Sequence, residues 1–200
     1  MTRVYVETNF VLELALNQPQ ASVCERLLTL AESGSLELAV PAFCLVEPLW
    51  TLGHRRGQRQ RLKESLDQEL RQLRRSGRAR DQVPGLLQLS TTLVQLARDD
   101  EKQLSQIQRR LMDCSTVLAM DAQVLNESQS AQRRRDLSGP DAVVFASVLC
   151  DLRQRPPTSA HFVTLNSKDF DEPRLVEDLA DQGCLLHTSF KAAMKQLSVT

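Results

Sequence analysis

The chain has 200 residues, a length that suits one domain, or one domain with a sizeable insertion, and allows a buried core. Lys plus Arg and Asp plus Glu both number 25, so any attraction for phosphate must come from a local patch. No apolar stretch approaches the roughly 20 residues of a membrane span, and the N-terminus lacks the long apolar core of a signal peptide. These features predict a cytoplasmic protein without membrane association.

The thiol and imidazole side chains are scattered along the chain. No two cysteines form a CxxC pair, and each lies among apolar neighbours, which favours buried reduced thiols over a disulfide framework or a zinc site. The histidines are equally dispersed, so a histidine-based metal site has no support. These residues are Cys24, Cys44, Cys114, Cys150 and Cys184, with His54, His161 and His187.

Strand and helix signals alternate over the first fifty residues. Short β-branched and aromatic runs indicate strands, and apolar residues at helical spacing indicate helices. We expect a strand at residues 4–6 and a helix beginning near Thr8 and Asn9. A helix at residues 21–32 ending at Gly34, a strand at 36–40, and a helix with Pro41 in its first turn should follow, the last carrying Glu47.

Residues 55–112 contain no strand signal. Leucines recur there at helical spacing, with breaks expected at Gly77, around Pro84 and Gly85, and at a charged turn at residues 99–101. This pattern predicts an all-helical hairpin or small bundle inserted into the alternating pattern. The segment is also basic, because residues 55–80 hold ten Lys or Arg against three Asp or Glu, an excess of seven positive charges.

The alternation returns in the last ninety residues. Strands are expected at residues 116–120, 161–165 and 184–187, and helices at 121–132, from 138 onwards, at 173–180 and at 189–197. The helix that opens at Ser138 is apolar on nearly every face and should be buried. The whole pattern predicts one α/β domain over residues 1–200, a three-layer parallel sheet with helices on both faces and the insertion at about 55–112.

Four acids fall where such a fold binds ligands, at the carboxyl ends of parallel strands. Glu7 follows the first strand and Asp169 follows the strand at 161–165, while Asp141 lies in the first turn of the buried helix and Glu47 about two turns into its own helix. Carboxylates that converge repel one another, and a divalent cation removes that penalty. An all-oxygen cluster suits Mg²⁺ or Mn²⁺ rather than zinc.

Each acid also has an ordinary structural interpretation. Asp141 fits the dipole of its helix, Glu47 a surface position, and Asp169 a turn capped by Asn166. Glu7, a charged residue at the end of an apolar strand, is the most informative of the four. The chain lacks the paired acids after the first strand that a phosphoacceptor receiver domain would have. It also has no glycine-rich motif of a P-loop or a dinucleotide-binding fold.

The sequence resembles the PIN-domain family, to which VapC-type toxins belong. The family opens with a hydrophobic strand, an acid, Thr or Ser, and Asn, as in VYVETNF; its second acid matches PAFCLVEPLW. Its third acid opens a buried helix, as in LSGPDAVVFAS, and a strand followed by Asn-x-Lys-Asp-Phe matches FVTLNSKDF. The resemblance runs from residue 4 to residue 170. The family's first acid is ordinarily Asp, and Glu7 stands there in this chain.

The resemblance implies a divalent-metal-dependent endoribonuclease, the toxin of a toxin–antitoxin pair being one form of it. Glu7, Asp141 and Asp169 would bind Mg²⁺ or Mn²⁺, and Glu47 would bind it or orient the attacking water. Thr8, Asn9, Thr164 and Asn166 would support these acids or contact phosphate. The expected partners are RNA, an antitoxin or other protein, and a second copy in a homodimer. The alternative is a PIN-like module that binds RNA or protein with weak or no catalysis.

The basic middle segment has two interpretations of equal weight. It is a solvated helix face, or its arginines contact the RNA backbone. The candidates for RNA contact are Arg71, Arg74, Arg75 and Arg78.

Overall fold

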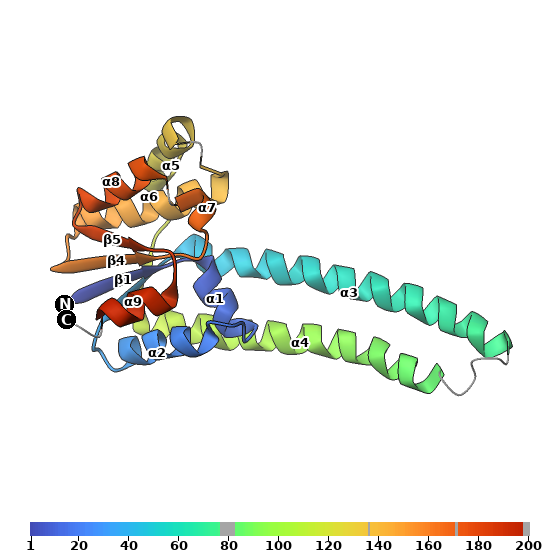
Figure 1. The fold of residues 1–200 in the computed structure, drawn as a ribbon. Coiled ribbons are helices and arrows are strands. Elements are labelled where there is room, and N and C mark those ends of the chain that lie inside the picture. The colour runs from blue at the N-terminus through green and yellow to red at the C-terminus, as the bar shows by residue number, and fades with distance from the viewer. Residues whose placement is uncertain (77–82, 136, 171, 198–200) are drawn as a thin grey trace.

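A computed structural model describes residues 1–76, 83–135, 137–170 and 172–197 (Figure 1). Five strands form one sheet in the order β3-β2-β1-β4-β5, and every neighbouring pair is parallel. This confirms the predicted α/β class. The strands are β1 (Thr2–Val6), β2 (Glu37–Pro41), β3 (Ser115–Leu118), β4 (Ser159–Val163) and β5 (Cys184–His187).

Helices flank the sheet on both faces, with α5, α6 and α8 on one side and α1, α2 and α9 on the other (Figure 1). Covering both faces makes the strands apolar along most of their length, as parallel sheets require. The helices are α1 (Thr8–Ala15), α2 (Ala21–Glu32), α3 (Ala42–Ser76), α4 (Val83–Cys114), α5 (Ala122–Arg135), α6 (Gly139–Gln154), α7 (Ser167–Phe170), α8 (Pro173–Ala180) and α9 (Phe190–Leu197).

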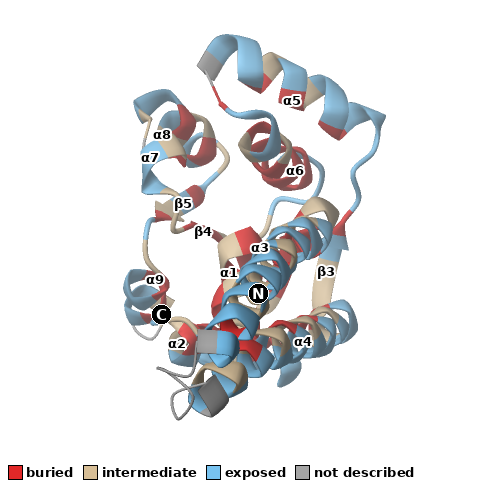
Figure 2. Cartoon of the chain, turned by 90° about the vertical axis from the view of Figure 1, so that its right-hand side faces the viewer, coloured by how far each residue is buried: buried red, intermediate tan, exposed pale blue. Residues whose placement is uncertain are grey.

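The core is centred on β1 and α6. The side chains of Tyr5 on β1, Phe145 on α6 and Phe162 on β4 are fully buried. Helix α6 is buried on nearly all sides between the sheet and α5, as its sequence predicted (Figure 2). Among the described residues, no helix is both long enough and apolar enough to cross a membrane.

Helices α3 and α4 form an antiparallel hairpin that projects far from the sheet (Figure 1). The insertion is therefore a hairpin and not a small bundle. The break predicted at residues 99–101 is wrong, because Asp100 and Glu101 are held by arginines of α3 while α4 continues unbroken. The expected break around Pro84 agrees with the start of α4 at Val83, and Gly77 lies outside the described residues.

The insertion and the helix of Glu47 are one element. Helix α3 runs from Ala42 to Ser76 with Pro48 inside it, so Glu47 and the first arm of the hairpin belong to one continuous helix. Pro41, which we expected in the first turn of this helix, is instead the last residue of β2. Gly34 ends α2 as predicted, with a φ of 71° that favours glycine.

Candidate functional site

Strands β1 and β4 are neighbours whose connections leave in opposite directions. From β1 the chain moves through β2 to β3, and from β4 it moves to β5 on the other side. In parallel sheets, the crevice at such a switch point, outside the carboxyl ends of the strands, is where ligands bind. Val6 pairs with Val163, so Glu7 and Thr164 leave the sheet side by side.

The carboxylate of Glu7 is buried, with 6% of the residue exposed, and accepts four hydrogen bonds. It caps α1 by accepting from the Asn9 backbone N–H at 2.9 Å, and the Asn9 amide donates to its other oxygen at 2.9 Å. The Thr164 hydroxyl and the Leu165 backbone N–H each donate to that same oxygen, Oε1, at 3.2 Å. Burial raises the pKa of Glu7, and these donors partly offset the rise.

A relay of hydrogen bonds connects Glu7 to Asp141. The Thr164 hydroxyl donates to Glu7 and accepts from the Asn166 backbone N–H at 2.9 Å, and the Asn166 amide donates to Asp141 at 3.1 Å. Asp141 lies in the first turn of α6, where the hydroxyl of the N-cap residue Ser138 also donates to its carboxylate. The turn that follows β4 thus bonds two carboxylates, those of Glu7 and Asp141, which lie far apart in the sequence.

Glu47 reaches the same region from α3. The hydroxyl of Thr8, the residue after Glu7, donates to the Glu47 carboxylate. Burial raises the pKa of the Cys44 thiol well above its usual value, and the nearby negative charges of Glu7 and Glu47 raise it further. The structure therefore connects Glu7 to Asp141 through hydroxyl and amide groups, and Glu47 is bonded to the neighbour of Glu7 in the chain.

Asp169 stands apart from this network. It lies on the one-turn helix α7, and Phe170 anchors that helix by packing edge-on against Phe162, with ring centroids 5.3 Å apart. The Asp169 backbone N–H donates to the Asn166 carbonyl at 3.3 Å. Within the described part of the chain, no interaction joins its carboxylate to the other acids, and its role as a ligand stays a prediction.

The three acids and the hydroxyl and amide groups bonded to them offer oxygen ligands, the kind that hard divalent cations prefer, and the Cys44 thiol lies beside them. Glu7 has only neutral hydrogen-bond donors around its buried charge, and its Oε2 accepts one bond and so keeps a lone pair. Hydrogen-bonding residues link Glu7 to Asp141, but the carboxylates do not form one cluster. Among the described residues, no three His, Cys, Asp or Glu side chains lie close enough to hold a metal.

Sequence reasoning missed two participants in this network. Ser138 precedes Asp141 by three residues, a spacing typical of helix-capping pairs, so a search for capping signals would have found it. The Leu165 backbone N–H leaves no sequence signal, because any residue supplies that donor and only the register of β1 against β4 directs it to Glu7.

The predicted RNA-contact arginines lie on the outer part of α3. Arg71, Arg74 and Arg75 are exposed, and Arg78 lies outside the described residues. A helix rises about 1.5 Å per residue, so Arg71 is about 36 Å from Glu47 along α3. These arginines and the acids can contact one RNA only if it extends along the hairpin.

The chain matches no family model, no curated protein and no solved structure.

Proposed function

We propose that this chain is a PIN-type endoribonuclease that hydrolyses RNA with the help of Mg²⁺ or Mn²⁺. The observation that carries the proposal is the relay that joins Glu7 to Asp141 where β1 and β4 end, with Glu47 bonded to Thr8, the residue after Glu7. Glu7 and Asp141 are linked at the switch point of a parallel sheet, Glu47 is bonded to the residue after Glu7, and the groups that bridge these acids are neutral. A cation there would relieve the repulsion between them.

Each residue has a distinct task in this proposal. Glu7 and Asp141 would hold the cation, Glu47 would hold it or orient the attacking water, and Asp169 would complete the set. A bound divalent cation supplies charge stabilisation and a more acidic water. Thr8 orients Glu47, and Asn166 orients Asp141. Thr164 fixes Glu7, so the first acid keeps its position as substrate binds.

Chelation and the substitution Asp141→Asn test this proposal together. We expect Mn²⁺-dependent cleavage of single-stranded RNA that EDTA removes, and at least a hundredfold lower rate in Asp141→Asn. The carboxamide can still accept from Asn166 and bond Ser138, while losing the charge near the helix N-terminus costs about 0.3–1 kcal/mol, so the variant stays folded. The control is Asp181→Asn, an exposed acid after α8, which should cleave at the parental rate.

One observation favours a second function, a PIN-like module that binds RNA or protein without catalysis. The Oε1 atom of Glu7 already accepts three hydrogen bonds, which leaves little capacity for a cation on that oxygen. In this case RNA binding persists in EDTA, no cleavage occurs with either metal, and Asp141→Asn changes nothing. Those results would reject the nuclease proposal.

A further inference from the structure

The single tryptophan of the chain lies on the helix that carries Glu47. Trp50 is 64% exposed, although an indole ring is large enough to gain much free energy from burial. Phe43 packs against it, with ring centroids 6.0 Å apart and ring planes at 70°. This contact supports the ring from one side. Most of the surface of a large aromatic side chain is therefore open to a ligand.

Helical geometry places this ring beside the acids. Trp50 follows Glu47 by three residues and Phe43 precedes it by four, and side chains at these spacings are neighbours on a helix, with Cβ atoms about 5–6 Å apart. Glu47 bonds Thr8 at the start of α1. Helix α3 contacts α1 and α6, and Figure 2 shows both on sides of α3 that α4 leaves uncovered. Trp50 thus lies within one helical turn of the candidate site.

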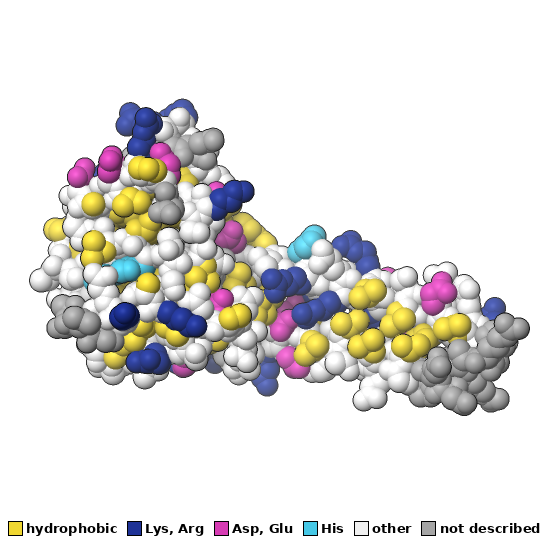
Figure 3. Space-filling view, in the orientation of Figure 1, with side chains coloured by type: hydrophobic (Ala, Val, Ile, Leu, Met, Phe, Trp, Pro, Cys, Tyr) yellow, Lys and Arg dark blue, Asp and Glu magenta, His cyan; other side chains and the backbone are white. Residues whose placement is uncertain are grey.

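The continuation of this side of α3 suits the backbone of a nucleic acid. Residues 48–63 contain five Lys or Arg and no Asp or Glu. His54 and Arg61 follow Trp50 by four and eleven residues, spacings that stay on one side of a helix, and both are exposed. Among the described residues, Arg61 has no carboxylate partner. Figure 3 shows Lys and Arg side chains on the part of the hairpin next to the body.

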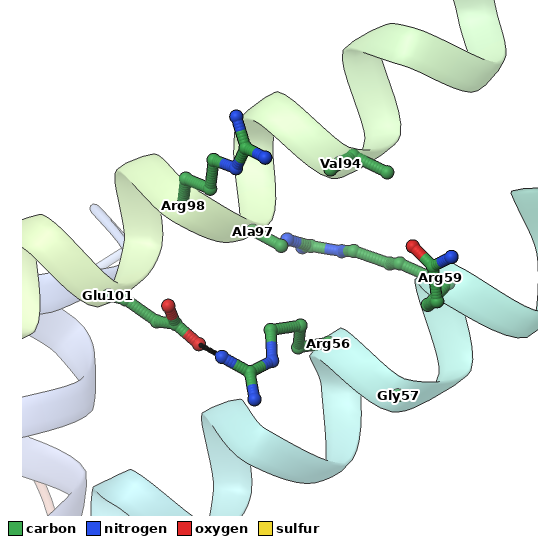
Figure 4. Close-up of a pocket in the computed structure, with 8 residues that line it drawn as sticks. Arg56, Gly57, Arg59, Val94, Ala97, Arg98 and Glu101 are labelled. Atoms are coloured by element: carbon green, nitrogen blue, oxygen red, sulfur yellow. Dashed lines mark hydrogen bonds and ion pairs between the residues drawn. The ribbon is translucent and has the colours of Figure 1, made fainter.

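Another side of α3 joins the two helices of the hairpin. Arg56 and Arg59 line a hollow between α3 and α4 (Figure 4). Arg56 pairs across the hairpin with Glu101 at 3.0 Å, and Arg59 pairs with Asp100 at 2.7 Å. These two cations are used to hold the helices together, so the side of α3 that carries Trp50 is the one left for a ligand near the acids.

We propose that Trp50 is the stacking platform for an unpaired base of the RNA, next to the phosphate that the acids would hold. The inference rests on the proposed function for the location of that phosphate. Proteins that bind single strands combine aromatic rings, on which bases stack, with cations that follow the backbone, and α3 offers both. A base reaches such a ring only when it is splayed out of a helix, so this subsite selects single-stranded RNA over a duplex.

The fluorescence of Trp50 tests the stacking directly, because the chain has no other tryptophan. A short single-stranded RNA is titrated into the parent chain in EDTA and into the Asp141→Asn variant in Mn²⁺, neither of which should consume it. We expect quenched emission at saturation. A strand of the same length without bases, and a duplex, should leave the emission nearly unchanged. Unchanged emission from chains that a filter assay shows to be saturated with RNA, or no binding to either chain, overturns the proposal.

Substitutions at this position separate stacking from simple apolar contact. Trp50→Leu keeps an apolar side chain without a ring and should bind the single strand at least about fivefold more weakly, whereas Trp50→Tyr should stay within about twofold of the parent. The matched control is Leu49→Ala, because Leu49 is 50% exposed on another side of the same turn, and it should bind as the parent does. Parental affinity in Trp50→Leu would assign the ring to a protein partner and overturn the proposal.

Cleavage by the same variants shows which of the two proposals fails. In an active chain, Trp50→Leu should raise KM and leave kcat near the parental value, because stacking binds substrate and transition state alike. Stacking without cleavage in either metal would reject the nuclease and keep the base subsite. Cleavage by the parent chain with an unchanged KM in Trp50→Leu would reject the base subsite and keep the nuclease.

Discussion

At the scale of single residues, Glu7 connects three parts of the fold through one carboxylate. It follows β1, caps α1 through the backbone of Asn9, and reaches the turn after β4 through Thr164 and Leu165. We attribute this reach to the longer side chain of Glu, which has to bond both the cap and the turn after β4. The resembled family ordinarily has Asp at this position, and the longer Glu7 of this chain makes additional hydrogen bonds to Thr164 and Leu165.

Shortening this side chain should separate its two tasks. In Glu7→Asp the cap on Asn9 is kept, because Asp is a favoured N-cap, but the bonds from Thr164 and Leu165 are lost. Leaving the buried Thr164 hydroxyl unpaired costs about 1–3 kcal/mol, and the half-buried Leu165 N–H adds a smaller cost, so the melting temperature should fall by several degrees. If the proposed function holds, cleavage measured well below that temperature should be maintained or raised. An unchanged melting temperature would contradict the role of the longer side chain.

At the scale of elements, β4 and β5 share a buried pair of histidines. His161 Nδ1 and His187 Nε2 are 2.9 Å apart, and the rings stack with centroids at 5.2 Å. Burial lowers the pKa of His161. Burial also lowers the pKa of His187, and the charge of His161 lowers it further. Both shifts favour the neutral form of the two rings in the folded chain.

This pair should make stability depend on pH. Below the ordinary histidine pKa of about 6.5 the unfolded chain binds protons that the folded chain does not, so stability falls on acidification. The slope approaches about 1.4 kcal/mol per pH unit for each proton. Urea unfolding at pH 7.5, 6.5 and 5.5 measures it. His187→Asn should flatten the slope, and His54→Asn, which changes an exposed histidine of α3, should leave it unchanged. Equal slopes in all three chains would refute the prediction.

The elements differ in how well the sequence predicts them. All five strands could be predicted, because short β-branched runs separated by helices leave few alternatives. The break at residues 99–101 could not be judged, since three successive acids look like a turn until Arg56 and Arg59 are known to face them. At the site, Glu7 and Asp141 were located from strand and helix ends, whereas their relay depends on a rotamer of Thr164 and on backbone N–H groups.

At the scale of the whole molecule, the hairpin has an inner and an outer part with different roles. The inner part belongs to the core, where Leu52 of α3 and Leu104, Ile107 and Leu111 of α4 join the buried cluster of the sheet. The outer part carries exposed leucines, such as Leu62, Leu89 and Leu96, and the exposed arginines. Glu47 lies near the start of α3, in the inner part. The outer part can therefore be removed without removing any residue of the candidate site.

Removing residues 60–97 and joining α3 to α4 through a short glycine-rich loop tests this division. The ends lie close, because Arg59 and Asp100 are bonded across the hairpin, and loops of two to five residues connect such helices. Circular dichroism should show that the shortened chain stays folded. If the proposed function holds, this chain should still cleave RNAs shorter than the roughly 36 Å between Glu47 and Arg71.

Longer RNAs should bind the shortened chain more weakly and with a flatter dependence on salt. Loss of Arg71, Arg74 and Arg75 as phosphate contacts reduces the slope of log affinity against log salt by about 0.7 for each on a single strand. Charge reversal of these arginines together with Arg78, in the full chain, should flatten the salt dependence at least as much. Parental affinity and salt slope in both variants would show that the arginines are a solvated face, and an unfolded body would show that the outer hairpin supports the core.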